Sequence, residues 1–241
     1  MKIALDPYMI RHLTLAELPA AVAELGYDQI ELSPRSDFLD WWVMPRATKP
    51  RMSEFKAAMR SAGVGLASLQ PMYRWASPFE DERQWAVRCW KKAIEVAVEM
   101  DCRLMVSEFG RGASPDRTVA ERNGLATNLN TKEACEAAWF RSMDELLPIF
   151  EREGIRVEIQ AHPWDFCEEH NETVDIVKSF RSENVKYVYS VPHTFFYDKG
   201  KGEVEKMLRY AGGDLSHVLI ADTRNHTKHC RYIVNPPGVD A

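Results

Sequence analysis

The chain has 241 residues, of which 45% are hydrophobic and 28% are charged, and its net charge is −5 at pH 7. This composition is that of a globular protein with a sizeable core, and the lack of a dense Lys/Arg run argues against a nucleic-acid partner. No apolar run is long enough to span a membrane, and the N-terminus lacks the apolar core of a signal peptide. Five cysteines, none in CxxC spacing, are typical of reduced thiols, so we expect a cytoplasmic protein.

Short apolar runs alternate with amphipathic stretches from the N-terminus onward. The first run, residues 2–6, is typical of a strand. The next stretch, 14–26, is predicted to be a helix, because Thr14 and Glu17 have capping-box spacing and Gly26 is a typical stop. The alternation continues with a strand at 27–33, a helix at 53–63, a strand at 64–71, a helix at 81–100, a strand at 103–109, a helix at 131–154 that Pro148 should kink, a strand at 156–162, a helix at 171–181, a strand at 185–191, a helix at 203–213 and a strand at 216–222.

About seven strands that alternate with six helices predict βαβ units and a parallel sheet. We expect one domain over residues 1–241, a (β/α) TIM-type barrel with its site at the C-terminal strand ends. A doubly wound sheet is the alternative, but the loop after the first strand lacks a glycine-rich phosphate fingerprint. Because a closed barrel has one strand more, we expect an incomplete barrel that is open between 2–6 and 216–222 and self-associates.

Polar side chains recur where the predicted strands end. In VEIQAHPWDF, residues 157–166, period-two spacing places Glu158, Gln160 and His162 on one face of a strand. Each polar residue also has a structural explanation, as a turn cap, a paired acid or a satisfied core histidine. Their recurrence strand after strand favours a common site. The set comprises Asp6, Glu31, Gln70, Tyr73, Arg74, Trp75, Glu108, Gln160, His162, His193 and Asp222.

Two other patterns have weaker functional interpretations. HTKHC at 226–230 has a spacing that can ligate a metal, but no second cluster is nearby in sequence, which favours a solvated loop. GRGASPDRT at 110–118 contains Gly, Ser and Arg near one another, but it matches no phosphate-loop spacing.

A series of short motifs resembles one family over the whole chain. The segments are MKIALDPYM, GYDQIELSPR, LQPMYRWASP, VSEFGRG, VEIQAHPWDF, YVYSVPHTFF, LSHVLIADTRNHT and RYIVNPPG. In this order they resemble the sugar phosphate isomerase/epimerase superfamily, the xylose isomerase-like TIM barrels. The resemblance implies a divalent metal (Mn, Mg or Zn), held by Glu, Asp, His and Glu on the later strands. It also implies proton abstraction beside a carbonyl through an enediolate, with carboxylates as bases.

The sequence departs from the family pattern at the implied metal ligands. The Glu of the E-x-H pattern falls on Gln160, although His162 is kept, and the Asp of D-x-x-H falls on Ser190, although His193 is kept. In the seventh strand the inward His position is Leu219, and the Glu of an eighth strand has no counterpart. An amide, a hydroxyl and an isobutyl group together hold a hard dication poorly. A metal at Gln160 and His193 is therefore expected to bind weakly.

Two functions remain open from the sequence. The first is an isomerase or epimerase that acts on a small polyhydroxy carbonyl compound. Its catalytic groups would be Glu108, His162 and His193, and its substrate contacts Glu31, Tyr73, Arg74 and Trp75. The second is a non-catalytic or shortened relative that binds a small polar ligand, which the substituted metal positions favour.

Overall fold

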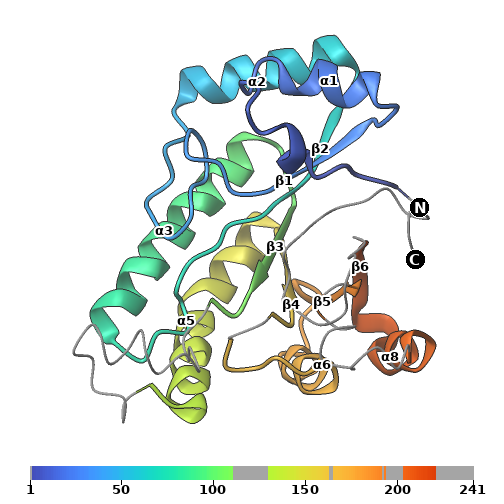
Figure 1. The fold of residues 1–241 in the computed structure, drawn as a ribbon. Coiled ribbons are helices and arrows are strands. Elements are labelled where there is room, and N and C mark those ends of the chain that lie inside the picture. Colours follow the sequence, from blue (N-terminus) through green and yellow to red (C-terminus); the bar gives the residue numbers. More distant parts are fainter. Residues whose placement is uncertain (1, 111–129, 163–164, 192, 194–202, 221–241) are drawn as a thin grey trace.

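The computed structural model describes residues 2–110, 130–162, 165–191, 193 and 203–220. Within them, six parallel strands form one sheet in the order of the sequence, so that each strand pairs with the next. The strands are β1 (Gln29–Leu32), β2 (Gly65–Leu69), β3 (Leu104–Glu108), β4 (Arg156–Gln160), β5 (Val185–Ser190) and β6 (Leu215–Leu219). The sheet curls into a half-barrel (Figure 1). This order confirms the incomplete barrel and contradicts a doubly wound sheet, whose strand order would reverse.

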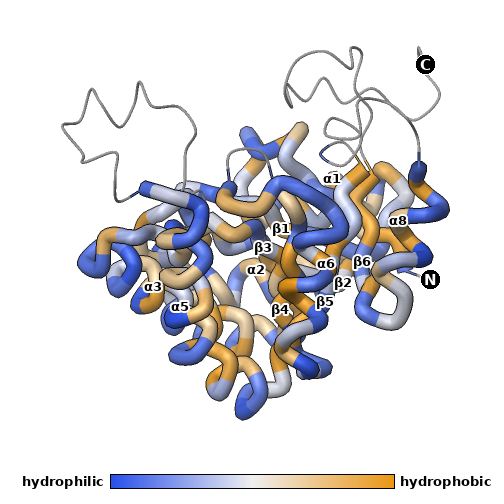
Figure 2. Tube along the Cα trace, turned by 90° about the horizontal axis from the view of Figure 1, so that it is seen from below, coloured by the Kyte–Doolittle hydropathy of each residue, from blue (hydrophilic) through white to orange (hydrophobic). Residues whose placement is uncertain are grey.

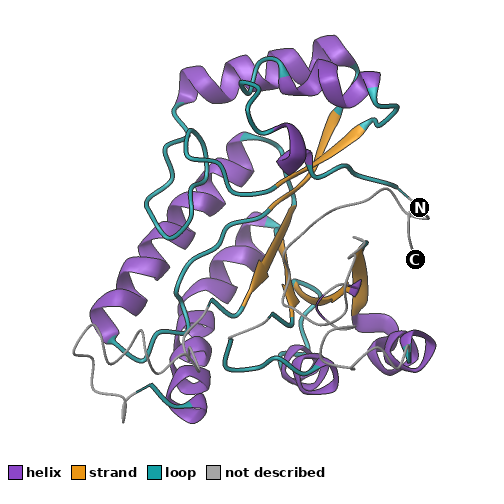
Figure 3. Ribbon diagram, in the orientation of Figure 1, coloured by secondary structure: helices purple, strands orange, loops and turns teal. Residues whose placement is uncertain are grey.

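Helices follow the strands and lie on the outside of the curled sheet (Figure 3). α3 and α5 pack side by side against its middle strands, and α1 and α2 accompany β1 and β2. α6 packs on β5, and α8 packs on α6. The α-helices are α1 (Leu18–Glu24), α2 (Lys49–Ala62), α3 (Glu80–Glu99), α5 (Lys132–Glu153), α6 (His170–Ser179) and α8 (Val204–Ala211), with short 3-10 helices η1 (Pro7–Ile10) and η2 (Gly212–Asp214).

The helix ends follow local chemistry. Thr131 caps α5, since its hydroxyl accepts a hydrogen bond from Ala134 N at 3.2 Å. That helix continues as one element through Pro148. The predicted second helix starts earlier than expected, at Lys49, because Thr48 is extended and Pro50 fits the first turn, where no backbone N–H is needed.

The predicted strand at residues 2–6 is mostly absent. Only Leu5 pairs with the sheet, through one bridge to Ile30 and a 2.9 Å bond from its N–H to Gln29 O. The chain turns away immediately, because Asp6 caps η1 by accepting a hydrogen bond from Tyr8 N at 3.1 Å. The described sheet therefore has six strands and a bridge, where the sequence predicted about seven strands.

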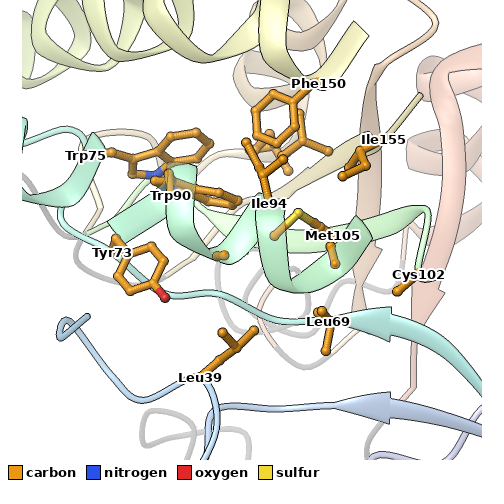
Figure 4. Close-up of a cluster of buried hydrophobic side chains, with 14 of the residues drawn as sticks. Leu39, Leu69, Tyr73, Trp75, Trp90, Ile94, Cys102, Met105, Phe150 and Ile155 are labelled. Carbon is orange, nitrogen blue, oxygen red and sulfur yellow. The ribbon is translucent and has the colours of Figure 1, made fainter. Parts of the chain in front are cut away.

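The core lies between the sheet and its helices, and hydrophobic residues concentrate along the strands (Figure 2). Its centre is a stack of fully buried indole rings. Trp75 lies 4.4 Å from Trp90 and 5.6 Å from Trp139 between ring centroids, and Phe150 contacts Trp90 edge-on (Figure 4). Such rings bury much apolar area with defined geometry, so they fix how α3 and α5 sit on the sheet.

Four of the cysteines lie among the described residues. Cys89, Cys102, Cys135 and Cys167 are free and buried. Among the described helices, none combines the length and apolarity needed to cross a membrane. The segments at 111–118 and 226–230, and Asp222, lie outside the described residues.

Candidate functional site

Three residues predicted from the strand ends meet at one point. β3 and β4 end together, and Glu108 is paired in register with Gln160, which puts both side chains on the inner face of the sheet. His162 follows two residues later, and its Nδ1 lies 3.1 Å from Glu108 Oε2. The ring of His193, beyond the end of β5, lies 4.5 Å from the His162 ring between centroids. Parallel pairing thus joins Glu108, His162 and His193, as the strand-end pattern predicted.

Asp165 joins this cluster and was not singled out from the sequence. One ligand atom from each of Glu108, His162 and Asp165 lies within 4.8 Å of the others. Asp165 is buried, its N–H donates to His162 O at 3.2 Å, and its Oδ2 accepts from Gly110 N at 3.2 Å. The available signal was an acid three residues after His162 in the turn of VEIQAHPWDF.

Gly110 shapes the backbone on the other side of Asp165. Its φ is +86°, a conformation that favours glycine, and an added Cβ would lie 2.1 Å from Tyr73 O. Only a residue without a side chain fits this close approach. The glycine therefore lets the backbone at the end of β3 approach Tyr73 closely, and the N–H of Gly110 donates to Asp165.

The aromatic residues predicted to touch substrate lie in the core. Trp75 is fully buried, and its Nε1–H donates to Glu108 O at 2.9 Å, so it supports the end of β3 through the backbone. Tyr73 is buried against Trp90. Arg74 pairs with Glu82 at 2.8 Å near the surface. A substrate contact by Tyr73, Arg74 or Trp75 stays a prediction.

Glu31 lies in a second cluster, which joins the two ends of the sheet. Its carboxylate accepts hydrogen bonds from Ser68 Oγ at 2.6 Å and Gln70 Nε2 at 2.7 Å. His217 of β6 lies between two acids, with Nε2 3.4 Å from Glu31 Oε2 and Nδ1 3.2 Å from Glu158 Oε2. Glu158 precedes Gln160 by two residues, so this cluster is one side-chain layer deeper than Glu108.

Burial and charge act in opposite senses on these groups. Burial raises the pKa of Glu31, although His217 and the Ser68 hydrogen bond oppose the rise. For His217, burial lowers the pKa, but the hydrogen bond to Glu158 and the charges of Glu31 and Glu158 outweigh it, so the pKa is raised. Arg156 adds a positive charge, with Nε 2.8 Å from Glu158. The imidazolium of His217 and the guanidinium of Arg156 together therefore balance two buried carboxylates.

We expect the free energy of unfolding to fall between pH 7 and 8.5. The folded-state pKa of His217 lies above the unfolded value of about 6.5. The charged imidazole therefore stabilises the fold fully below pH ~6.5. This stabilisation is lost as the pH rises through the folded pKa, by up to ~1.4 kcal/mol per pH unit. Glu31, whose pKa is also raised, has the same sign, whereas the contribution of Asp6, whose pKa burial raises to about 6, is lost below this window. Urea denaturation of the parent across this window measures the slope.

Other buried groups act at the two sides of this window. Burial lowers the pKa of His170, so its opposing contribution is complete above the unfolded value of about 6.5. Burial raises the pKa of Cys89 and of Cys102 to about 11, whereas unfolded thiols titrate at about pH 8.5, so these thiols add to the fall at the upper end of the window. Replacing Glu158 with Gln should shift the fall to lower pH, and the imidazole proton shifts of His217 in NMR should follow it. A parent stability that is flat or rising from pH 7 to 8.5 would contradict a charged His217.

The metal ligands implied by the family do not fit a hard dication in this chain. Gln160 and Ser190 supply an amide and a hydroxyl, and Leu219, paired in register with Ser190, supplies no ligand atom. A different set does offer suitable atoms, namely the carboxylates of Glu108 and Asp165 and the imidazole of His162. A possible metal-ligand triad is thus present, at other residues than the sequence indicated.

Comparison with known proteins supports the architecture. Residues 19–239 match the model of the xylose isomerase-like TIM barrel family. The chain belongs to this family. No curated protein matches it. The resemblance seen in the sequence motifs is therefore confirmed at the level of the family.

Solved structures of this family share the fold at low sequence identity. A D-tagatose 3-epimerase-like protein matches with a TM-score of 0.70 and 19% identity over 95% of this chain and 78% of that chain. The D-psicose 3-epimerase of Clostridium cellulolyticum H10, solved with D-tagatose, matches with a TM-score of 0.69 and 20% identity, over 86% and 67%. A xylose isomerase-like TIM barrel protein from Mycobacterium smegmatis, in complex with magnesium, matches with a TM-score of 0.62 and 14% identity, over 88% and 68%.

Proposed function

We propose that this protein is a sugar isomerase or epimerase that acts on a small polyhydroxy carbonyl compound by moving a proton beside the carbonyl. The observation that carries the proposal is the 3.1 Å contact between Glu108 and His162 at the C-terminal strand ends, with a carboxylate only 3% exposed. The family supports the reaction class, and the D-psicose 3-epimerase among the similar structures supports a ketose as the substrate class. In this fold, chemistry takes place at these strand ends.

The side chains present can divide the proton transfer between them. Glu108, as a carboxylate, would accept the proton from the carbon next to the carbonyl, and the electron pair of that C–H bond would form the enediolate. An imidazole N–H of His162 or His193 would donate to the oxygen on which negative charge develops. Return of the proton from Glu108 to the adjacent carbon, with a proton moved between the two oxygens by an imidazole, would isomerise the sugar. Epimerisation would instead require a second acid that delivers a proton to the opposite face of the same carbon.

A binding protein without catalysis is the second candidate. The substitutions at Ser190 and Leu219 favour it, because a relative that has lost those metal ligands can keep the polar groups at the strand ends without the reaction. Both candidates use the same strand ends, so the choice between them depends on proton exchange.

Exchange with solvent distinguishes these candidates even when the product of the reaction is unknown. The purified protein, with and without added Mn²⁺, is incubated in D₂O with D-fructose, D-tagatose and D-psicose, and proton NMR follows the C–H groups beside the carbonyl. We expect deuterium to enter one of these positions in at least one sugar. Sugar binding without deuterium incorporation would instead support the binding protein. The absence of both sugar binding and deuterium exchange would contradict a ketose substrate.

A further inference from the structure

One buried polar atom at the strand ends is left without a partner. Gln160 is 4% exposed, yet its side-chain Oε1 has no hydrogen-bond partner among the described residues. A buried amide oxygen without a donor costs about 1–3 kcal/mol, so such atoms call for a specific explanation. Gln160 lies beside Glu108 in register, so these two side chains share the inner face, and His162 follows two residues later, beyond the end of β4.

The neighbours of Gln160 are themselves metal-ligating groups. Glu108, His162 and Asp165 each place one ligand atom within 4.8 Å of the other two. Glu108 and Asp165 are 3% and 4% exposed, so two carboxylates share a dry site with one imidazole. Carboxylates brought together away from water repel each other unless a proton or a cation compensates them. A divalent cation would neutralise both and give the amide oxygen of Gln160 a partner.

We propose that Glu108, His162, Asp165 and the Gln160 amide oxygen bind a divalent transition metal, with Mn²⁺ as the fitting class. Apart from Gln160, this set differs from the ligand positions implied by the family, because Ser190 and Leu219 on β5 and β6 take no part and the turn after β4 supplies two ligands. Mixed carboxylate, amide and imidazole ligands suit Mn²⁺. The inference deepens the proposed function, since the metal would polarise the sugar oxygens beside Glu108.

The site is tested by titrating Mn²⁺ into the full chain without sugar. Electron paramagnetic resonance of free Mn²⁺ reports binding, because the free-ion signal is lost when the ion binds. We expect about one ion per chain, at least about tenfold weaker binding for Asp165→Asn, and unchanged binding for Ser190→Ala, the matched control at the family position. Asp165→Asn keeps the shape and an oxygen that accepts from Gly110 N.

Each outcome of the titration either supports these ligands for the Mn²⁺ ion or excludes them. Absence of stoichiometric Mn²⁺ binding by the parent, or equal binding by Asp165→Asn and the parent, would overturn the site. Loss in Ser190→Ala as large as in Asp165→Asn would place the ion at the family position instead. A melting profile without metal, matched to the parent, shows that each variant is folded. Binding without deuterium exchange in any sugar would leave this site standing and contradict the proposed reaction.

The role of Gln160 has its own test in the variant Gln160→Glu. A carboxylate at this position adds a full charge to a site with two others, which should lower the melting midpoint without metal and increase the rise caused by Mn²⁺. Thermal melts of parent and variant, each with and without Mn²⁺, measure the difference. An equal Mn²⁺ response in both proteins would remove Gln160 from the ligand set.

Discussion

Replacing His217 with Leu is expected to lower the free energy of unfolding by about 3–5 kcal/mol at pH 7. The imidazole is 19% exposed and lies within 3.4 Å of Glu31 and Glu158, which are 4% and 0% exposed as side chains. Without it, two buried carboxylates share one layer of the half-barrel and only Arg156 offsets one of them. Urea denaturation followed by tryptophan fluorescence measures the loss.

The control for His217→Leu is His12→Leu, which removes an exposed imidazole and should change the stability little. Adding Glu158→Gln to His217→Leu should recover part of the loss, because one of the two unpaired charges is then gone. If His217→Leu alone lowers the free energy of unfolding by less than about 1 kcal/mol, His217 forms no buried salt bridge with Glu31 and Glu158.

Glu108→Gln is expected to slow deuterium exchange into the sugar by about 10²–10⁴-fold, the usual contribution of a positioned general base. The amide has the same shape as the carboxylate and can still hydrogen-bond His162, but it cannot accept the substrate proton. Initial exchange rates by NMR, at saturating sugar, give the ratio of variant to parent.

A matched control for this variant is Glu95→Gln, an exposed acid of α3 that pairs with Lys92. It should keep the parent rate, and both variants should keep the parent melting profile. If Glu108→Gln retains exchange within about threefold, another group is the base and the proposed role of Glu108 is wrong.

The repeating pattern predicted most of the fold, because helix and strand periods are local properties of the chain. One exception was the run at 2–6, where Asp6 and Pro7 favour a 3-10 turn after a single paired residue, Leu5. An apolar run does not show how soon a capping side chain will end it. The start of α2 was misplaced for the same reason, since Thr48 and Pro50 outweigh the amphipathic pattern.

The candidate site was predictable only where strand geometry determines it. Period two and parallel pairing placed Glu108 beside Gln160 and His162. Asp165 was missed because residues in a turn after a proline follow no repeating pattern, so the sequence does not show where their side chains point. Trp75 shows the converse, since an aromatic residue after a strand end can face substrate or core, and here it packs on Trp90.

The sequential strand order also has a consequence for the way the chain assembles. Each strand pairs with its immediate successor, so the sheet can grow from the N-terminus during synthesis, and each step closes a loop of only one helix. Contact between His217 and Glu31 joins the first strand to the last and can form only when β6 is in place. Until then Ser68 and Gln70 hold Glu31, Arg156 holds Glu158, and the charge that His217 will offset is left to water or protons. Arrival of β6 is therefore the step at which we expect the nascent half-barrel to lose the solvent from its interior.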